Sequence, residues 1–223
     1  MSIESTFRGR AKEVRAYLKS LQDIEARIQI GQRGFFRAAK TVTASRAAAY
    51  IMIYNCIEHA FRECVSATRR DMSQNVQDFS TLKSFWRKDM LSHSFGKKLG
   101  TGCNYGEFLG ELADFFPGTV AWTAEAEAAI PFNGNIDQQR LHRFRRDIEG
   151  GAWKAPKGTL GGNDLTTIRD RRNELAHGEE SFDNVGSGCT TADLIEVLDR
   201  IRIFMISFIK YMERYRSGQL YKT

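Results

Sequence analysis

Three stretches of this chain repeat apolar residues at intervals of three and four, and this spacing restricts its fold more than any other feature. Such a repeat places the apolar side chains on one face of an α-helix, which must then pack against another element. The clearest repeat begins at Thr190 or Thr191 and ends near Tyr215. Its apolar positions are Leu194, Val197, Leu198, Ile201, Phe204, Met205, Phe208, Ile209 and Met212. We therefore expect a long amphipathic helix with one buried face.

Two comparable repeats lie near the N-terminus. The spacing predicts a first helix from Ala11 to about Gly31 and a second from about Ala38 toward Arg70. The apolar stripe of the first is Val14, Leu18, Leu21, Ile24 and Ile28. The second has a broader apolar face, which indicates a central, buried helix. That face comprises Ala47, Ala48, Ile51, Ile53, Tyr54, Ile57, Ala60, Phe61 and Val65. Helices of this kind predict an all-α helical bundle.

The region between these repeats is less regular. Shorter helices are predicted over Asp78–Leu91, Asn104–Phe115 and Ile136–Ile148. All three prolines lie between Pro117 and Gly162, where glycines are also frequent and the periodicity is weak. Within this region Gly158–Gly162 lacks the Gly-Lys-Ser/Thr ending of a phosphate-binding P-loop, so we interpret it as an ordinary loop.

Length and composition fit one globular domain. The chain has 223 residues, of which 42% are hydrophobic, enough for a sizeable core. We expect a single domain over residues 1–223, with core helices over about 11–115 and 163–215 and an irregular insertion over about 117–162.

The cysteines and the apolar runs indicate the compartment. The chain has four cysteines without a C-x-x-C pair, namely Cys56, Cys64, Cys103 and Cys189, so we expect reduced, buried thiols and neither a zinc site nor a disulfide framework. The first ten residues have no apolar run, and residues 203–209 are far shorter than the roughly 20 residues of a membrane span. We expect a soluble cytoplasmic protein that needs no cofactor and no metal.

Basic residues gather in one part of the chain. The formal net charge is +6, but residues 140–172 alone contain nine Lys/Arg against four Asp/Glu. Such an excess is equally typical of a solvated basic face and of a surface that binds phosphates. The candidate RNA-binding residues there are Arg143, Arg145, Arg146, Lys154 and Arg169. Trp153 lies among them and is a candidate for stacking on a base.

Directly after this basic stretch comes the motif with most chemical content. Asn163 or Asp164 can cap a helix, and Gly178 is well placed to end it in a left-handed conformation. Its last turns read R-N-x-x-x-H from Arg172 to His177. A permanent cation close to a group that titrates near neutral pH suits an attacked phosphate. The alternative is that His177 only caps helix carbonyls and favours the helix dipole.

Three segments occur in an order that resembles a known family. They are Tyr54-Asn55-Cys56-Ile57-Glu58, Gly134-Asn135-Ile136-Asp137, and Arg172 through Phe182 with its Leu-Ala-His-Gly centre. The chain resembles the HEPN superfamily over roughly residues 13–215, and more narrowly the MAE-type, toxin-like branch of bacterial conflict systems. The resemblance implies a HEPN-like bundle that dimerises through its motif-bearing helices and cuts RNA without a metal.

The same resemblance implies roles for individual residues. Arg172 and His177 would be catalytic, with Asn173 beside them, and Arg171 and Glu58 would support the site. His177 can exchange a proton with a ribose 2′-OH or a leaving 5′-oxygen, and Arg172 can hold the scissile phosphate. For Glu58, a structural ion pair with an arginine is an equal alternative.

Helix geometry adds a reason to expect a homodimer. Five residues turn through about 140°, so Arg172 and His177 do not share one helix face, and a second subunit can complete the site. Asn173, four residues before His177, does share its face.

The resemblance also implies a toxin–antitoxin or antiphage role, with an antitoxin or another regulator as partner. Some HEPN toxins have a tyrosine two residues after the histidine, where this chain has Glu179. Two alternatives remain: a non-catalytic module that binds RNA or nucleotides, and a helical adaptor that recruits a protein.

Overall fold

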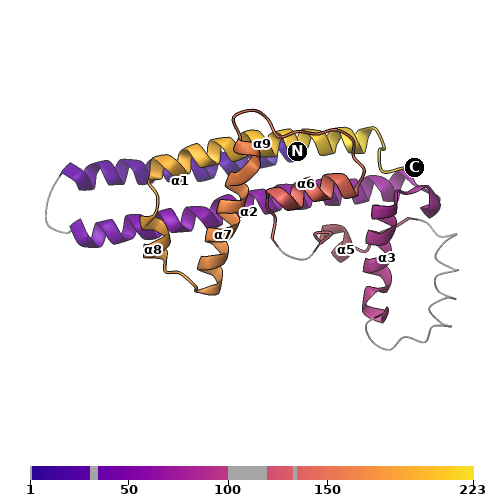
Figure 1. Ribbon diagram of the computed structural model, residues 1–223, viewed down its shortest axis with the longest axis horizontal. Helices are drawn as coiled ribbons and strands as arrows, with labels where there is room; N and C mark the ends of the chain where they lie inside the picture. Colours follow the sequence, from indigo (N-terminus) through magenta and orange to yellow (C-terminus); the bar gives the residue numbers. More distant parts are fainter. Residues whose placement is uncertain (1, 31–34, 100–119, 133–134) are drawn as a thin grey trace. The chain divides into compact units, whose positions relative to one another are not determined.

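The computed structural model describes residues 2–30, 35–99, 120–132 and 135–223. In these ranges the chain is helical without a named strand (Figure 1), which confirms the all-α prediction. The α-helices are α1 (Ile3–Ile30), α2 (Phe35–Asn75), α3 (Ser84–Leu99), α5 (Ala124–Ala128), α6 (Gln138–Asp147), α7 (Asn163–His177), α8 (Phe182–Ser187) and α9 (Thr191–Ser217). Two short 3-10 helices are η1 (Phe79–Thr81) and η2 (Leu160–Gly162).

The chain divides into two compact units that share α2 and α9. The first unit comprises residues 1–60, 135–140 and 154–209, and the second comprises residues 61–134, 141–153 and 210–223. The prediction of a single domain over 1–223 stays a prediction.

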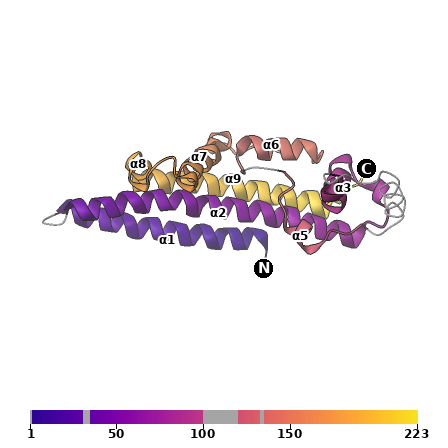
Figure 2. The same cartoon turned by 90° about the horizontal axis from the view of Figure 1, so that it is seen from below.

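The first unit is built on α1 and the N-terminal parts of α2 and α9. Figures 1 and 2 show α1 running beside α2. The Tyr17 hydroxyl on α1 donates to the Ser45 carbonyl on α2 at 2.9 Å, and Arg15 on α1 pairs with Asp199 on α9. These contacts hold the three helices around a buried apolar core.

The apolar stripes largely face this core, as predicted. Most of the α9 positions are buried, whereas Val197 is half-buried. On α1 the prediction was wrong at Ile24, which is 49% exposed. It was also wrong about the start of α1, because the helix begins at Ile3 and buries Phe7 among charged neighbours.

The second unit is organised around a buried ion pair. Arg69 on α2 is fully buried and binds both carboxylate oxygens of Asp89 on α3, at 3.0 and 2.7 Å. The same guanidinium donates to the Ala126 carbonyl on α5 at 2.6 Å, and Trp122 donates to Asp89 at 3.1 Å. Three segments of the unit are therefore joined at one arginine.

Two expectations for the middle of the chain need correction. Trp153 is only 6% exposed and stacks near His142 and Tyr211, so it belongs to the core of the second unit and does not offer a face to a base. The segment predicted as one helix over Asp78–Leu91 is η1 followed by α3, because the backbone is extended at Leu82 (φ −75°, ψ 144°) and interrupts the helix. The helix predicted over 104–115, like Cys103, lies outside the described residues.

The remaining elements agree with the sequence in outline. The basic helix predicted around Ile136–Ile148 is α6, and the short helices α5 and α8 were not predicted. Cys56 and Cys64 are buried, as expected, whereas the expectation was wrong at Cys189, which is half-buried. Among the described residues, no helix is long and apolar enough to cross a membrane.

Candidate functional site

The motif helix α7 is preceded by Gly162, a position that favours glycine for two reasons. Gly162 has φ 95°, and a Cβ there would approach the Phe204 ring to 2.5 Å. The prediction that Asn163 or Asp164 caps this helix was wrong, because no side chain caps it. Asp164 is instead buried against α9, where it accepts two hydrogen bonds from Arg200 at 2.7 and 3.1 Å.

The other end of α7 is as predicted. Gly178 has φ 69°, and its N–H bonds the carbonyls of the last helical turn. His177 is therefore the last helical residue, and its side chain is exposed. Within the described part of the chain, the His177 side chain makes no hydrogen bond or ion pair. No contact between the His177 side chain and the helix carbonyls therefore supports the alternative that His177 only caps the helix.

Arg172 is held from two sides. Its Cζ lies 4.8 Å from the centre of the Tyr54 ring on α2, a cation–π contact, and its Nη1 donates to Asn173 Oδ1 at 3.1 Å. The side chain is half-buried. Tyr54 thus fixes the position of the guanidinium, while part of the guanidinium remains open to solvent.

Asn173 belongs to a chain of hydrogen bonds that links three distant segments. Its Oδ1 also accepts from Asn135 Nδ2 at 3.0 Å. The Tyr54 hydroxyl donates to Asn135 Oδ1 at 3.3 Å and accepts from the backbone N–H of Ile136 at 3.1 Å. The three sequence segments that carry the family resemblance therefore meet at Arg172 and Asn173.

The Tyr54 hydroxyl holds its proton more tightly in this environment than in water. Burial raises the pKa of its hydroxyl, and the negative charge of Glu58 one helical turn away adds to this effect. The Ile136 hydrogen bond and the Arg172 charge act in the opposite direction but do not cancel it. Glu58 is half-buried, and both interpretations of this residue, orienting the site or forming an ion pair, stay open.

The two neighbouring arginines have carboxylate partners. Arg171 donates to Glu174 at 2.8 Å, and this hydrogen bond raises the pKa of its guanidinium. Arg169 is paired with Asp170 at 2.6 Å and with Asp137. Of the three arginines on α7, only Arg172 has no ion pair within the described residues.

The other predicted RNA-binding residues are divided between the units. Arg143, Arg145 and Arg146 belong to the second unit, and Lys154 belongs to the first, as Arg172 does. Arg143, Arg146 and Lys154 are exposed, while Arg145 donates to the Gly151 carbonyl at 3.1 Å. Their role in binding RNA stays a prediction.

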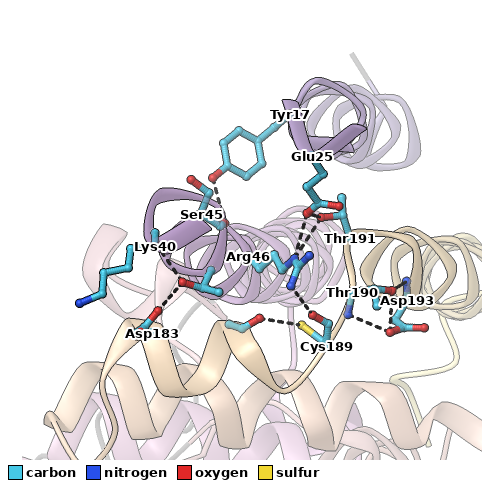
Figure 3. A network of polar contacts seen from close by, with 12 residues as sticks. Tyr17, Glu25, Lys40, Ser45, Arg46, Asp183, Cys189, Thr190, Thr191 and Asp193 are labelled. Carbon is cyan, nitrogen blue, oxygen red and sulfur yellow. Dashed lines mark hydrogen bonds and ion pairs between the residues drawn. The ribbon is translucent and has the colours of Figure 1, made fainter. Parts of the chain in front are cut away.

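The segment after the motif helix is fixed by a network around Arg46 on α2 (Figure 3). Arg46 pairs with Glu25 at 2.9 Å and donates to the Cys189 carbonyl, also at 2.9 Å. Thr191, the first residue of α9, bonds the same Glu25. Gly186 on α8 packs so closely on α2 that a Cβ would lie 1.7 Å from the Thr43 carbonyl oxygen. The chain that follows His177 is thereby held against α2.

The structure adds two residues to which the sequence gave no role, Tyr54 and Asn135. Each lies in one of the three segments that carry the resemblance, so the available signal was the order of those segments. Their contacts with each other and with α7 span too many residues for helical periodicity to predict them.

An all-helical bundle whose motif helix ends in R-N-x-x-x-H, with the arginine anchored and the histidine exposed, defines a HEPN-type domain. The model of the RiboL-PSP-HEPN family matches residues 5–214, and the chain belongs to this family. This confirms the resemblance at the level of the HEPN superfamily. Neither a curated protein nor a solved structure matches the chain. HEPN membership indicates a ribonuclease-like or nucleotide-related module.

Proposed function

We propose that this protein is an endoribonuclease that cleaves RNA by attack of a ribose 2′-OH on the adjacent phosphate. Arg172, Asn173 and His177 carry the reaction. The observation that supports this most is the contrast within α7: Arg172 is anchored on Tyr54 without an ion pair in the described residues, and His177 is exposed without a partner there.

His177 acts in proton transfer. An exposed imidazole can take the proton from the 2′-OH, or return one to the leaving 5′-oxygen. The nucleophile belongs to the substrate, so the reaction needs neither a cofactor nor a metal ion to generate it. The products are a 2′,3′-cyclic phosphate or 3′-phosphate end and a 5′-OH end. DNA is inert because it lacks this nucleophile.

Arg172 binds the scissile phosphate and stabilises the negative charge that develops on its oxygens. A guanidinium is permanently charged and planar, and it presents several N–H donors to phosphate. Since Tyr54 and Asn173 already hold this side chain, little reorganisation is needed when the substrate binds. Arg171, paired with Glu174, has a supporting role.

The active species is a homodimer in which two motif helices face each other. Arg172 and His177 lie about 140° apart around α7, so a single helix cannot direct both at one phosphate from the same face. A second copy can supply the missing group. Arg143, Arg145, Arg146, Lys154 and Arg169 are the remaining candidates for RNA-backbone contacts.

The finer assignment follows the family resemblance. We place the protein in the MAE-type, toxin-like branch, in a toxin–antitoxin or antiphage system with an antitoxin or another regulator as partner. Glu179 replaces the tyrosine that is modified in some HEPN toxins, so control through that tyrosine does not apply. The free thiols of Cys56 and Cys64 are compatible with action in the reducing cytoplasm.

The experiment is digestion of total cellular RNA in EDTA by the purified protein, with mapping of the fragment ends. Wild type should leave cyclic-phosphate or 3′-phosphate ends. His177→Ala should lose about 10²–10⁴-fold in rate and lose toxicity in cells. His93→Ala, which removes a histidine of the second unit whose Nε2 lies 3.7 Å from Asp89 Oδ1, is the control and should cleave RNA as wild type does.

Different results in this experiment would indicate the binding module or the adaptor instead. RNA that is bound in a salt-sensitive way but never cut indicates the non-catalytic HEPN binding module. If His177→Ala remains toxic and fully active, the proposed role of this histidine is wrong. If mutation of neither Arg172 nor His177 affects RNA while a protein partner is still recruited, the protein is an adaptor.

A further inference from the structure

The hydrogen bonds beside Arg172 have a fixed direction. A guanidinium has only donors, so Asn173 must present Oδ1 to Arg172 Nη1, as it does at 3.1 Å. Asn135 meets the same oxygen with Nδ2 at 3.0 Å. Asn135 therefore presents its own Oδ1 to the Tyr54 hydroxyl, 3.3 Å away.

At the other end of this row of hydrogen bonds, Ile136 requires the same donor-to-acceptor direction. The backbone N–H of Ile136 can only donate, and it donates to the Tyr54 oxygen at 3.1 Å. The hydroxyl hydrogen of Tyr54 is then available for Asn135. Tyr54 is 1% exposed and Ile136 is fully buried, so water does not compete at this end.

This direction has a consequence for Asn173. Its carbonyl oxygen accepts two hydrogen bonds, whereas its Nδ2 has no partner among the described residues. The amide NH2 group and the open part of the Arg172 guanidinium therefore lie together as donors. Two neighbouring donor groups suit the oxygens of one phosphate.

We propose that Tyr54 and Asn135 are positioning residues that hold the Asn173 amide in this orientation, so that its NH2 group serves with Arg172 as a second donor to the scissile phosphate. This inference rests on the proposed ribonuclease function. If the Asn173 amide turned over, it would present an oxygen to the phosphate and repel it. Tyr54 has a second role, because its ring supports Arg172.

The first test removes the donor from Asn135 without changing the size of the side chain. Asn135→Leu has no group that can bond Asn173, and Asn135→Asp offers only oxygens at neutral pH. Both should lower the cleavage rate by about 10²-fold, the loss expected from a misplaced reacting group. Asn184→Asp makes the same change at an exposed asparagine whose side chain bonds only Glu180 within the described residues, and it should cleave as wild type does.

The pH profile separates positioning from a purely structural role. A protonated carboxyl can donate to Asn173 Oδ1, so Asn135→Asp should recover relative to wild type as the pH falls. At pH values above the pKa of the carboxyl, each unit by which the pH falls raises the protonated fraction about tenfold. The charged groups around this position are Arg172 on α7, Glu58 on α2, and Asp137 with its partner Arg169. Asn135→Leu has no titrating group and should show no recovery.

Tyr54→Phe tests the other end without adding charge. The ring under Arg172 is retained, but the hydroxyl that orients Asn135 is lost. The cleavage rate should fall about tenfold or more without recovery at low pH. If all three variants cleave as wild type does, the proposal is overturned. It is equally overturned if Asn135→Asp is impaired by the same factor at every pH, or if Asn135→Leu is fully active.

Binding keeps this test separate from the test of the function itself. The affinity of each variant for a 2′-O-methyl RNA, which cannot be cut by this route, is measured by fluorescence anisotropy over the same pH range. If wild type cuts no RNA, the proposed function fails, but weaker binding by Asn135→Asp that recovers in acid still supports the orientation of Asn173. Unchanged binding in that case contradicts it.

Discussion

Arg69 in the second unit and Arg172 in the first are both held by other parts of the chain, but they are held differently. Arg69 is fully buried, and its guanidinium is occupied by both oxygens of Asp89 and by backbone carbonyls. Arg172 is half-buried, rests on an aromatic ring and shares one amide oxygen. A saturated guanidinium stabilises a fold, whereas an anchored but unsaturated one can bind an anion.

The largest effect on stability is expected from removal of the buried arginine, Arg69. Arg69→Ala leaves the buried Asp89 carboxylate without its counter-ion, which should lower the free energy of unfolding by about 3–5 kcal/mol. Arg70→Ala, at the neighbouring exposed position that pairs with Glu127, should cost at most about 1 kcal/mol. Urea denaturation measures both. Equal losses for the two variants would mean that burial does not distinguish these arginines.

Arg172→Ala should give the reverse pattern. Loss of the group that stabilises charge on the phosphate should lower the cleavage rate by about 10²–10³-fold. Its cation–π contact is partly exposed, so the free energy of unfolding should change by no more than about 1 kcal/mol. Single-turnover cleavage and urea denaturation of the same sample test this directly. A variant that loses stability and activity together would place Arg172 in the same class as Arg69.

The two glycines that bound α7 offer a smaller contrast within the first unit. Both have positive φ, so alanine should cost about 1–2 kcal/mol at either one. At Gly162 the added Cβ would also collide with Phe204, whereas at Gly178 it meets no atom within 4 Å. Thermal unfolding should therefore show Gly162→Ala to be the more destabilised. Equal melting temperatures would show that the Phe204 ring moves aside freely.

The effect at the thiol of Cys56 in the first unit is absent at neutral pH and arises only in alkaline solution. Burial raises its pKa from 9.0 to about 11, so the folded state holds this proton more tightly than the unfolded chain. The resulting stabilisation is complete below about pH 9 and is lost as the pH rises toward 11. Urea denaturation across this range should show a shallower decline for Cys56→Ala than for wild type. Parallel declines would contradict the raised pKa.

The parts of the fold that local patterns specify were predictable. Leu194, Leu198 and Ile201 lie on one buried face because their spacing matches the helical repeat. Gly178 ends α7 because glycine adopts the left-handed conformation at little cost. Long-range partners were not predictable. Nothing near Asp164 in the sequence indicates that it bonds Arg200 on α9 and leaves the helix without a side-chain cap.

The candidate site shows the same limit. The sequence indicated the chemistry of Arg172 and His177, because the residue types and their spacing are local. Tyr54 and Asn135 received no role, since their contacts with α7 depend on the packing of α2 and the 135–140 segment. Trp153, in contrast, was given a role in stacking on a base that it does not have. Its neighbour Lys154 is exposed, whereas Trp153 itself is buried.

One measurement tests the proposed chemistry most directly. An RNA oligonucleotide that contains a mapped cleavage site is compared with the same oligonucleotide carrying a single 2′-deoxy sugar on the 5′ side of the scissile phosphate, in EDTA. If the 2′-OH is the nucleophile, wild type cuts the first and leaves that position of the second intact, while other sites are cut equally. Cleavage of both at the same rate would contradict the mechanism assigned to Arg172 and His177.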